Sequence, residues 1–117
     1  MGRLSTHVLD NANGKPARGV AIELFAVDGG NRRSVLRTVT NADGRTDSPL
    51  MTGEAFRPGS YELVFEVGAY FKALGTPTAD PPFLDSVPVR FTIAEPEGHY
   101  HVPLLVTPWS YSTYRGS

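Results

Sequence analysis

The 117-residue sequence contains no cysteine, which excludes disulfide bonds and thiolate metal sites. A membrane-spanning helix needs about 20 apolar residues in a row, and no apolar run in the sequence approaches that length. The first residues also lack the apolar core of a signal peptide. We therefore expect a soluble, cytoplasmic protein. The length suits one domain over residues 1–117, large enough to bury a core without a metal or a disulfide.

Neither sign of charge is in excess. Eleven lysine and arginine residues stand against twelve aspartate and glutamate residues, for a formal net charge of −1. A nucleic acid or an anionic membrane surface attracts proteins with clustered positive charge. The composition therefore argues against both kinds of partner.

Glycine and proline are abundant, with twelve and ten residues that divide the chain into short segments. In three of these segments, residues 20–26, 61–67 and 87–93, apolar residues alternate with polar ones. A period of two is typical of a strand with one buried face, and such strands need a second layer to cover them. The pattern predicts an all-β fold, a β-sandwich.

The remaining segments complete this prediction. Further strands are expected at residues 4–10, 35–40, 45–47, 99–107 and 110–114. Residues 69–75 contain helix formers that end at Gly75 and are followed by Pro77, so they predict one short helix. No internal repeat or linker divides the chain.

The three histidines all fall in predicted strands, and two of them lie on one face. His99 and His101 are two residues apart, so they point the same way as Pro103 and Leu105. The opposite face is apolar and is predicted to be the core side; it consists of Tyr100, Val102, Leu104 and Val106. The histidines are therefore expected on the outer face of the sandwich. Proline in a strand predicts a bulge or a position without a ladder hydrogen bond.

This histidine face has more than one interpretation. A single histidine on a strand is most often a surface or structural residue, and Arg45 in "DGRTD" is ordinarily a solvated turn residue. Two histidines beside apolar residues on an outer face favour a functional site. His7, His99 and His101 also offer enough nitrogen ligands for a zinc ion with an open position.

Three separated motifs resemble a known family. They are "LSTHVLDNANGKPARGV", "NADGRTD" and "GHYHVPLLVTPWSYSTYRGS", which together span nearly all of the chain in the same order as in that family. The sequence is similar to the 5-hydroxyisourate hydrolases, the transthyretin-related enzymes of urate degradation. The tetrapeptide at residues 114–117 is the most specific mark of the resemblance.

The resemblance implies a fold and an assembly. The fold is a transthyretin-like β-sandwich of two four-stranded sheets with one short helix. The assembly is a homotetramer, a dimer of dimers, in which outer faces enclose a channel with the active sites at its mouths. Pro103 and Leu105 would then be buried only where dimers meet. Tyr114 shares a face with Ser112, so the terminal stretch is expected to curl into the same site.

The resemblance also implies a reaction and its residues. Water opens the ring of 5-hydroxyisourate at the N1–C6 bond, which gives 2-oxo-4-hydroxy-4-carboxy-5-ureidoimidazoline. No cofactor and no resident metal is implied, so zinc would bind only adventitiously. The implied roles are catalytic for His7, Arg45, His101 and Ser117, substrate-binding for His7, Arg45, Tyr114 and Arg115, and supporting for His99.

The chemistry assigns these residue types to distinct steps. A histidine can accept a proton at neutral pH, so either His7 or His101 is the base, and the sequence leaves that choice open. The guanidinium of Arg45 suits substrate carbonyls and a developing oxyanion.

A non-catalytic ligand carrier with the same fold is the alternative. The carrier transthyretin has lysine, glutamate and threonine where this chain has His7, Arg45 and His101, and it lacks the terminal tetrapeptide. Because those exchanges would remove the base and the oxyanion donor, the enzyme is favoured over the carrier.

Overall fold

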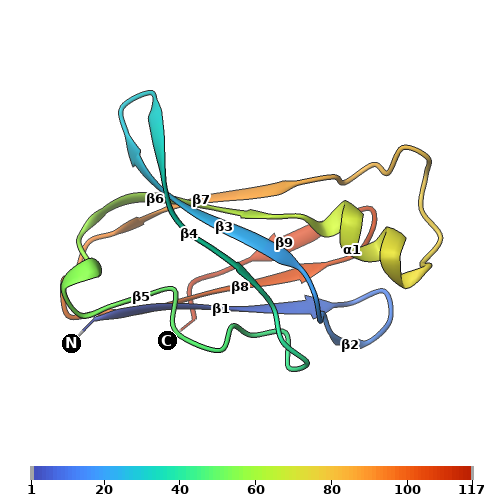
Figure 1. Ribbon diagram of the computed structural model, residues 1–117, viewed down its shortest axis with the longest axis horizontal. Coiled ribbons are helices and arrows are strands. Elements are labelled where there is room, and N and C mark those ends of the chain that lie inside the picture. Colours follow the sequence, from blue (N-terminus) through green and yellow to red (C-terminus); the bar gives the residue numbers. More distant parts are fainter. Residues whose placement is uncertain (1, 117) are drawn as a thin grey trace.

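Two sheets pack face to face in the computed structural model, which describes residues 2–116 (Figure 1). The first sheet has the order β2-β1-β8-β9, with β5 also paired to β1, and the second has the order β4-β3-β6-β7. The strands of the first sheet are β1 (Arg3–Asp10), β2 (Lys15–Pro16), β5 (Met51–Thr52), β8 (His99–Val106) and β9 (Tyr111–Thr113). Those of the second are β3 (Ala21–Asp28), β4 (Asn31–Val39), β6 (Gly59–Phe65) and β7 (Val87–Ile93).

The alternation in the sequence decides which residues fill the space between the sheets. Strands β1 and β8 run parallel, with Leu4 opposite Tyr100 and Val8 opposite Leu104. These four side chains are buried, as predicted for the core face of β8. The second sheet contributes a matching inner face of Ile22, Leu24, Tyr61, Leu63, Phe65, Val87, Val89 and Ile93. The predicted sandwich is confirmed.

Helix α1 (Val67–Leu74) follows β6 at one end of the sandwich, away from the end where the two chain termini lie (Figure 1). It begins two residues earlier than predicted and ends where predicted, because Gly75 adopts a left-handed conformation with φ of 83°. The Gly75 N–H donates to the carbonyls of Lys72 and Phe71. A second, one-turn helix, the 3-10 helix η1 (Gly53–Ala55), was not predicted. Within residues 2–116, no helix is both long and apolar enough to cross a membrane.

The predicted strand at residues 45–47 is wrong. The side chain of Asn41 accepts hydrogen bonds from the backbone N–H groups of Asp43 and Arg45, and the Asn41 N–H donates to the Arg45 carbonyl. These bonds hold the segment in a turn and occupy backbone groups that a strand would need. The short pairing to β1 is made instead by β5, and the two-residue β2 brings the first sheet to five strands rather than the expected four.

Pro103 is accommodated in β8 without a bulge in the pairing to β1. The register with β9 pairs Leu104 with Thr113, and the Gly116 N–H donates to the His101 carbonyl farther along. Continuing that register places Pro103 opposite Tyr114. Because proline has no backbone N–H, Pro103 cannot donate a sheet hydrogen bond to Tyr114. Strand β9 ends at Thr113, whose hydroxyl donates to the Pro103 carbonyl at 2.7 Å. Pro103 is already buried within one chain, which corrects the expectation that only an assembly would bury it.

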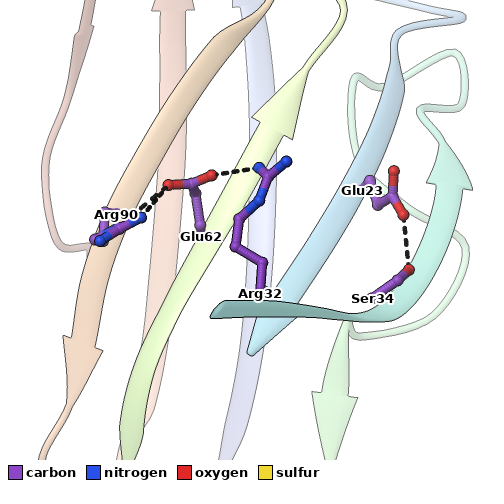
Figure 2. Close-up of polar contacts among 5 residues, drawn as sticks. All are labelled: Glu23, Arg32, Ser34, Glu62 and Arg90. Carbon is purple, nitrogen blue, oxygen red and sulfur yellow. Dashed lines mark hydrogen bonds and ion pairs between the residues drawn. The ribbon is translucent and has the colours of Figure 1, made fainter. Parts of the chain in front are cut away.

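The outer face of the second sheet is occupied by charges that satisfy one another. Figure 2 shows Glu62 between Arg32, at 2.7 Å, and Arg90, at 3.1 Å, with Glu23 bonded to Ser34 nearby. Burial raises the pKa of Glu62, but the hydrogen bonds and charges of the two arginines outweigh that effect and lower it. The Glu62 carboxylate is therefore paired within the sheet, and we do not assign it to a ligand-binding site.

A buried carboxylate joins β1 to α1. Asp10 is fully buried, and it accepts hydrogen bonds from the Tyr70 hydroxyl at 2.7 Å and from the Asn13 side chain at 2.8 Å. The backbone N–H groups of Ala12 and Asn13 also donate to it. Burial acts to raise the pKa of Asp10, but these hydrogen bonds outweigh it and hold that pKa below its usual 3.8.

We predict that Tyr70→Phe lowers the free energy of unfolding by about 1–3 kcal/mol at pH 7, because the lost hydrogen bond is made to a buried charge. A carboxyl group with a lowered pKa in the folded state stabilises above its unfolded pKa, and that contribution fades as the pH falls through the folded value. Urea unfolding at pH 7 and pH 3 should therefore show a smaller cost at pH 3.

Tyr61→Phe is the matched control for this prediction. The Tyr61 hydroxyl donates to the neutral carbonyl of Arg57 at 2.7 Å, so its loss should cost the same at both pH values. An equal cost of Tyr70→Phe at pH 7 and pH 3 would contradict the assigned role of the Asp10 carboxylate.

Candidate active site

Two histidine rings face each other across the β1–β8 pair. His7 lies on β1 and His101 on β8, and their ring centroids are 6.5 Å apart at an interplanar angle of 43°. Both residues are half-buried on the outer face, which confirms the face predicted for His101. The register places Ser5 directly opposite His101 and Pro103 opposite His7. Neighbouring strands thus bring together residues 94 positions apart in the chain.

His101 is oriented and kept neutral by its surroundings. Its Nδ1 lies 2.8 Å from the Ser5 hydroxyl, which fixes the ring plane. Burial lowers the pKa of His101 most, and electrostatic interactions, first with the Arg45 charge and then with His7, lower it further. At neutral pH the imidazole is therefore held in the form that accepts a proton.

His7 is held by the turn that precedes Arg45. Its Nε2–H donates to the backbone carbonyl of Asp43 at 2.8 Å, which places the proton on Nε2 in the neutral ring. The other ring nitrogen, Nδ1, is then the acceptor. His7 is therefore suited to receive a hydrogen bond from a bound molecule.

A glycine allows the Arg45 turn to sit against β1. Gly44 has φ of +74°, and a Cβ atom there would lie 2.3 Å from the Val8 carbonyl oxygen. The Gly44 carbonyl accepts the Val8 N–H at 2.7 Å, so the turn is fastened next to His7. The exposed Arg45 borders a shallow hollow that Arg3, Ser5 and Asp47 also line.

The C-terminal stretch contacts His101 through a second glycine. The Gly116 N–H donates to the His101 carbonyl at 2.7 Å. A Cβ atom on Gly116 would lie 2.9 Å from the Cδ2 atom of the His101 ring, closer than real Cβ atoms approach. The tail therefore covers part of the imidazole and contributes to its burial.

The other predicted site residues lie along the start of β8 and the C-terminal stretch. Tyr114 is 59% exposed and borders a cavity at the sheet edge together with Val89 and Phe91. The guanidinium of Arg115 stacks over the ring of Tyr100, and His99 is exposed at the start of β8. Ser117 lies outside the described residues. The structure thus brings His7, His101 and Arg45 together, with His99 two residues away from His101 on the same face of β8 and Arg115 stacked on Tyr100.

Sequence reasoning missed two residues that shape this site, Ser5 and Gly44, whereas Gly116 belongs to the tetrapeptide that the sequence singled out. Ser5 was detectable in part, since it lies two residues before His7 and shares its face. Its contact with His101 depends on the β1–β8 register, which no local pattern reveals. Among the described residues, no three histidine, aspartate or glutamate side chains gather as a metal site would require.

The chain is similar to known proteins over nearly its whole length. The family model of the HIUase/Transthyretin family matches residues 4–116. A protein of Pseudomonas aeruginosa named 5-hydroxyisourate hydrolase is 56% identical over 117 residues, which cover 100% of this chain and 93% of that protein.

Two solved structures share the fold. The 5-hydroxyisourate hydrolase of Klebsiella pneumoniae has a TM-score of 0.81 and 36% identity, with 100% of both chains covered. Sea bream transthyretin in complex with thyroxine has a TM-score of 0.85 and 33% identity, with 97% of this chain and 94% of that chain covered. The matched sequence and the shared two-sheet architecture together show that this chain belongs to the HIUase/Transthyretin family.

Proposed function

We propose that the protein hydrolyses 5-hydroxyisourate to 2-oxo-4-hydroxy-4-carboxy-5-ureidoimidazoline. The observation that carries this proposal is a half-buried histidine with a lowered pKa, His101, beside a second histidine and the arginine Arg45. Relatives named 5-hydroxyisourate hydrolase, at 56% and 58% identity over nearly the whole chain, support the choice of substrate.

His101 is the proposed base. Its neutral ring accepts a proton from water as the water oxygen bonds to C6 of the substrate, and the electron pair of the C=O bond moves to oxygen. When the carbonyl re-forms, the N1–C6 bond breaks and N1 takes up the proton that His101 accepted, which returns the ring to its neutral form. The Ser5 hydroxyl at 2.8 Å holds the ring in one plane while the proton moves.

Arg45 and His7 are the proposed partners of this step. The Arg45 guanidinium stabilises the developing oxyanion, and a preorganised donor of this kind is worth about 3 kcal/mol in the transition state. The same charge lowers the pKa of His101, so one side chain serves both the base and the oxyanion. His7 accepts a hydrogen bond at Nδ1 and so orients the substrate, with its other nitrogen bonded to the Asp43 carbonyl.

The direct test follows the ultraviolet absorbance of freshly generated 5-hydroxyisourate with and without the protein. The proposal expects its decay to accelerate in proportion to protein concentration. Decay at the spontaneous rate at every concentration would contradict the proposal.

The assembly is also proposed, as a homotetramer built as a dimer of dimers. On the outer face of the first sheet, Leu9 lies opposite Leu105, and both remain half-exposed beside the histidines. Trp109, two residues before β9, and Tyr111, the first residue of β9, are also exposed, at 56% and 44%, at the edge of that sheet. Apolar and aromatic surface of this kind favours contact with further copies of the chain.

We predict that His101→Asn lowers kcat by at least about 100-fold, because general-base catalysis contributes about 10²–10⁴. His7→Asn should also lower kcat by about 100-fold, because a misplaced substrate can cost that much. Both side chains lie on the outer face and leave the core intact, so circular dichroism should match that of the unchanged protein. If either variant folds and keeps the full rate, the role assigned to that histidine is wrong.

The pH dependence of kcat/KM provides a separate prediction. Its acid limb should lie below the usual histidine value of 6.5, because the pKa of His101 is lowered. Arg45→Gln removes a nearby positive charge, which should raise the pKa of His101 and move the limb to higher pH, along with a loss of rate. Arg33→Gln, which removes an exposed charge from β4, is the control and should leave the limb in place. A limb that moves to lower pH in Arg45→Gln would refute the coupling.

Sedimentation tests the proposed assembly. We predict a mass of about four subunits at micromolar concentration, since closed two-fold symmetry is the usual solution for self-complementary patches. Replacing the half-exposed Leu105 by glutamate should shift the distribution to smaller species. A fully active, stable monomer would contradict the proposed channel.

A further inference from the structure

We infer that Arg115 is a positioning residue, which clamps the C-terminal tail on the ring of Tyr100 so that Gly116 stays against His101. This assignment replaces the substrate contact expected for Arg115 from the sequence. Its kinetic consequence rests on the proposed function, whereas its structural consequence does not.

The guanidinium of Arg115 contacts the start of β8 in two ways. Its Cζ atom lies 4.0 Å from the centroid of the Tyr100 ring, and its Nη2 donates to the His99 carbonyl at 3.3 Å. A planar guanidinium can stack on an aromatic ring and donate from its edge at the same time. Both contacts are made to the first two residues of β8, next to His101.

The ring of Tyr100 is a rigid platform. Tyr100 is only 6% exposed, and its hydroxyl accepts the backbone N–H groups of Ala94 and Glu95 at 3.0 and 3.1 Å. The Phe56 ring packs 6.0 Å away, and a Cβ atom on Gly98 would lie 2.7 Å from the Tyr100 ring. A side chain enclosed in this way cannot follow a moving tail, so it fixes whatever stacks on it.

The tail needs such a clamp because the sheet does not hold it continuously. Strand β9 ends at Thr113, and Pro103 cannot donate to the position opposite, which is Tyr114. The next backbone bond joins Gly116 to His101, and that contact leaves no room for a side chain. Arg115 lies between these two points and replaces the missing ladder bond with its own contacts.

The same geometry separates Arg115 from the reacting groups. Successive residues of a strand point to opposite faces, so Tyr100 faces the core side and His101 faces the outer side. A guanidinium stacked on Tyr100 therefore lies across β8 from the His101 ring. Arg45, His7 and Ser5 face His101 from the outer side, and Gly116 covers it from the tail.

Amide hydrogen exchange of Gly116 in the full chain tests the clamp without any substrate. Arg115→Gln removes the guanidinium, and with it the stacking on Tyr100 and the charged donor to the His99 carbonyl, so we expect the Gly116 amide to exchange roughly three- to thirtyfold faster. Arg33→Gln is the charge-matched control on the other sheet and should leave this amide unchanged. Unchanged exchange in Arg115→Gln would overturn the inference.

Kinetics then separate positioning from substrate contact. A loosened tail should lower kcat by roughly ten- to a hundredfold with little change in KM, since no substrate contact is lost. Tyr100→Leu should have the same effect, and the double variant should be no worse than either single one. Tyr100→Phe, which retains the ring, should keep the Gly116 amide protected.

Two kinetic outcomes would overturn the inference. One is a rise in KM alone for Arg115→Gln, and the other is a multiplied loss in the double variant. Tyr100→Leu alters a buried side chain, so its thermal unfolding is compared with that of Tyr100→Phe. If Tyr100→Leu does not fold, the kinetics of the exposed Arg115→Gln variant decide whether Arg115 positions the tail. If the unchanged protein hydrolyses no 5-hydroxyisourate, the proposed function fails, while the Gly116 exchange still decides the clamp.

Discussion

The parallel pairing of β1 with β8 is the constraint on which the site depends. It places Ser5 opposite His101 and sets the His7 ring 6.5 Å away. A shift of this register by one residue would turn either strand's histidine toward the core, since the side-chain period is two. The register is fixed by the buried partners on the other face, such as Leu4 with Tyr100 and Val8 with Leu104. Core packing therefore determines the geometry of the polar face.

Two loops complete the site by close contact with this pair of strands. The turn before Arg45 approaches through Gly44 and the tail through Gly116, and in both places a Cβ atom would collide with β1 or β8. These contacts bring a positive charge toward His101 and remove solvent from it, and both effects lower its pKa. The lowered pKa of His101 thus depends on the close approach of two backbone segments to β1 and β8, which only glycine permits at these positions.

Local patterns predicted much of this structure. The period of two predicted the long strands and the outer position of His101, and Gly75 predicted where α1 ends. The turn at residues 45–47 was missed because the Asn41 side chain competes for the backbone. The positions of Tyr114 and Arg115 depend on how Pro103 interrupts the pairing of β8 with β9 and on the ring of Tyr100. Those positions follow from the register of two consecutive strands and from a stacking contact, and the alternation of apolar residues encodes neither.

The fold alone does not distinguish hydrolysis from ligand binding, because a thyroxine-bound transthyretin shares it with a TM-score of 0.85. The distinction lies in the face that carries His7, Arg45 and His101. The central claim is that this face keeps His101 neutral and ready to accept a proton. An NMR titration of the histidine rings in the ligand-free protein measures this directly. The account predicts a His101 midpoint below 6.5, and a midpoint at or above 6.5 would contradict it.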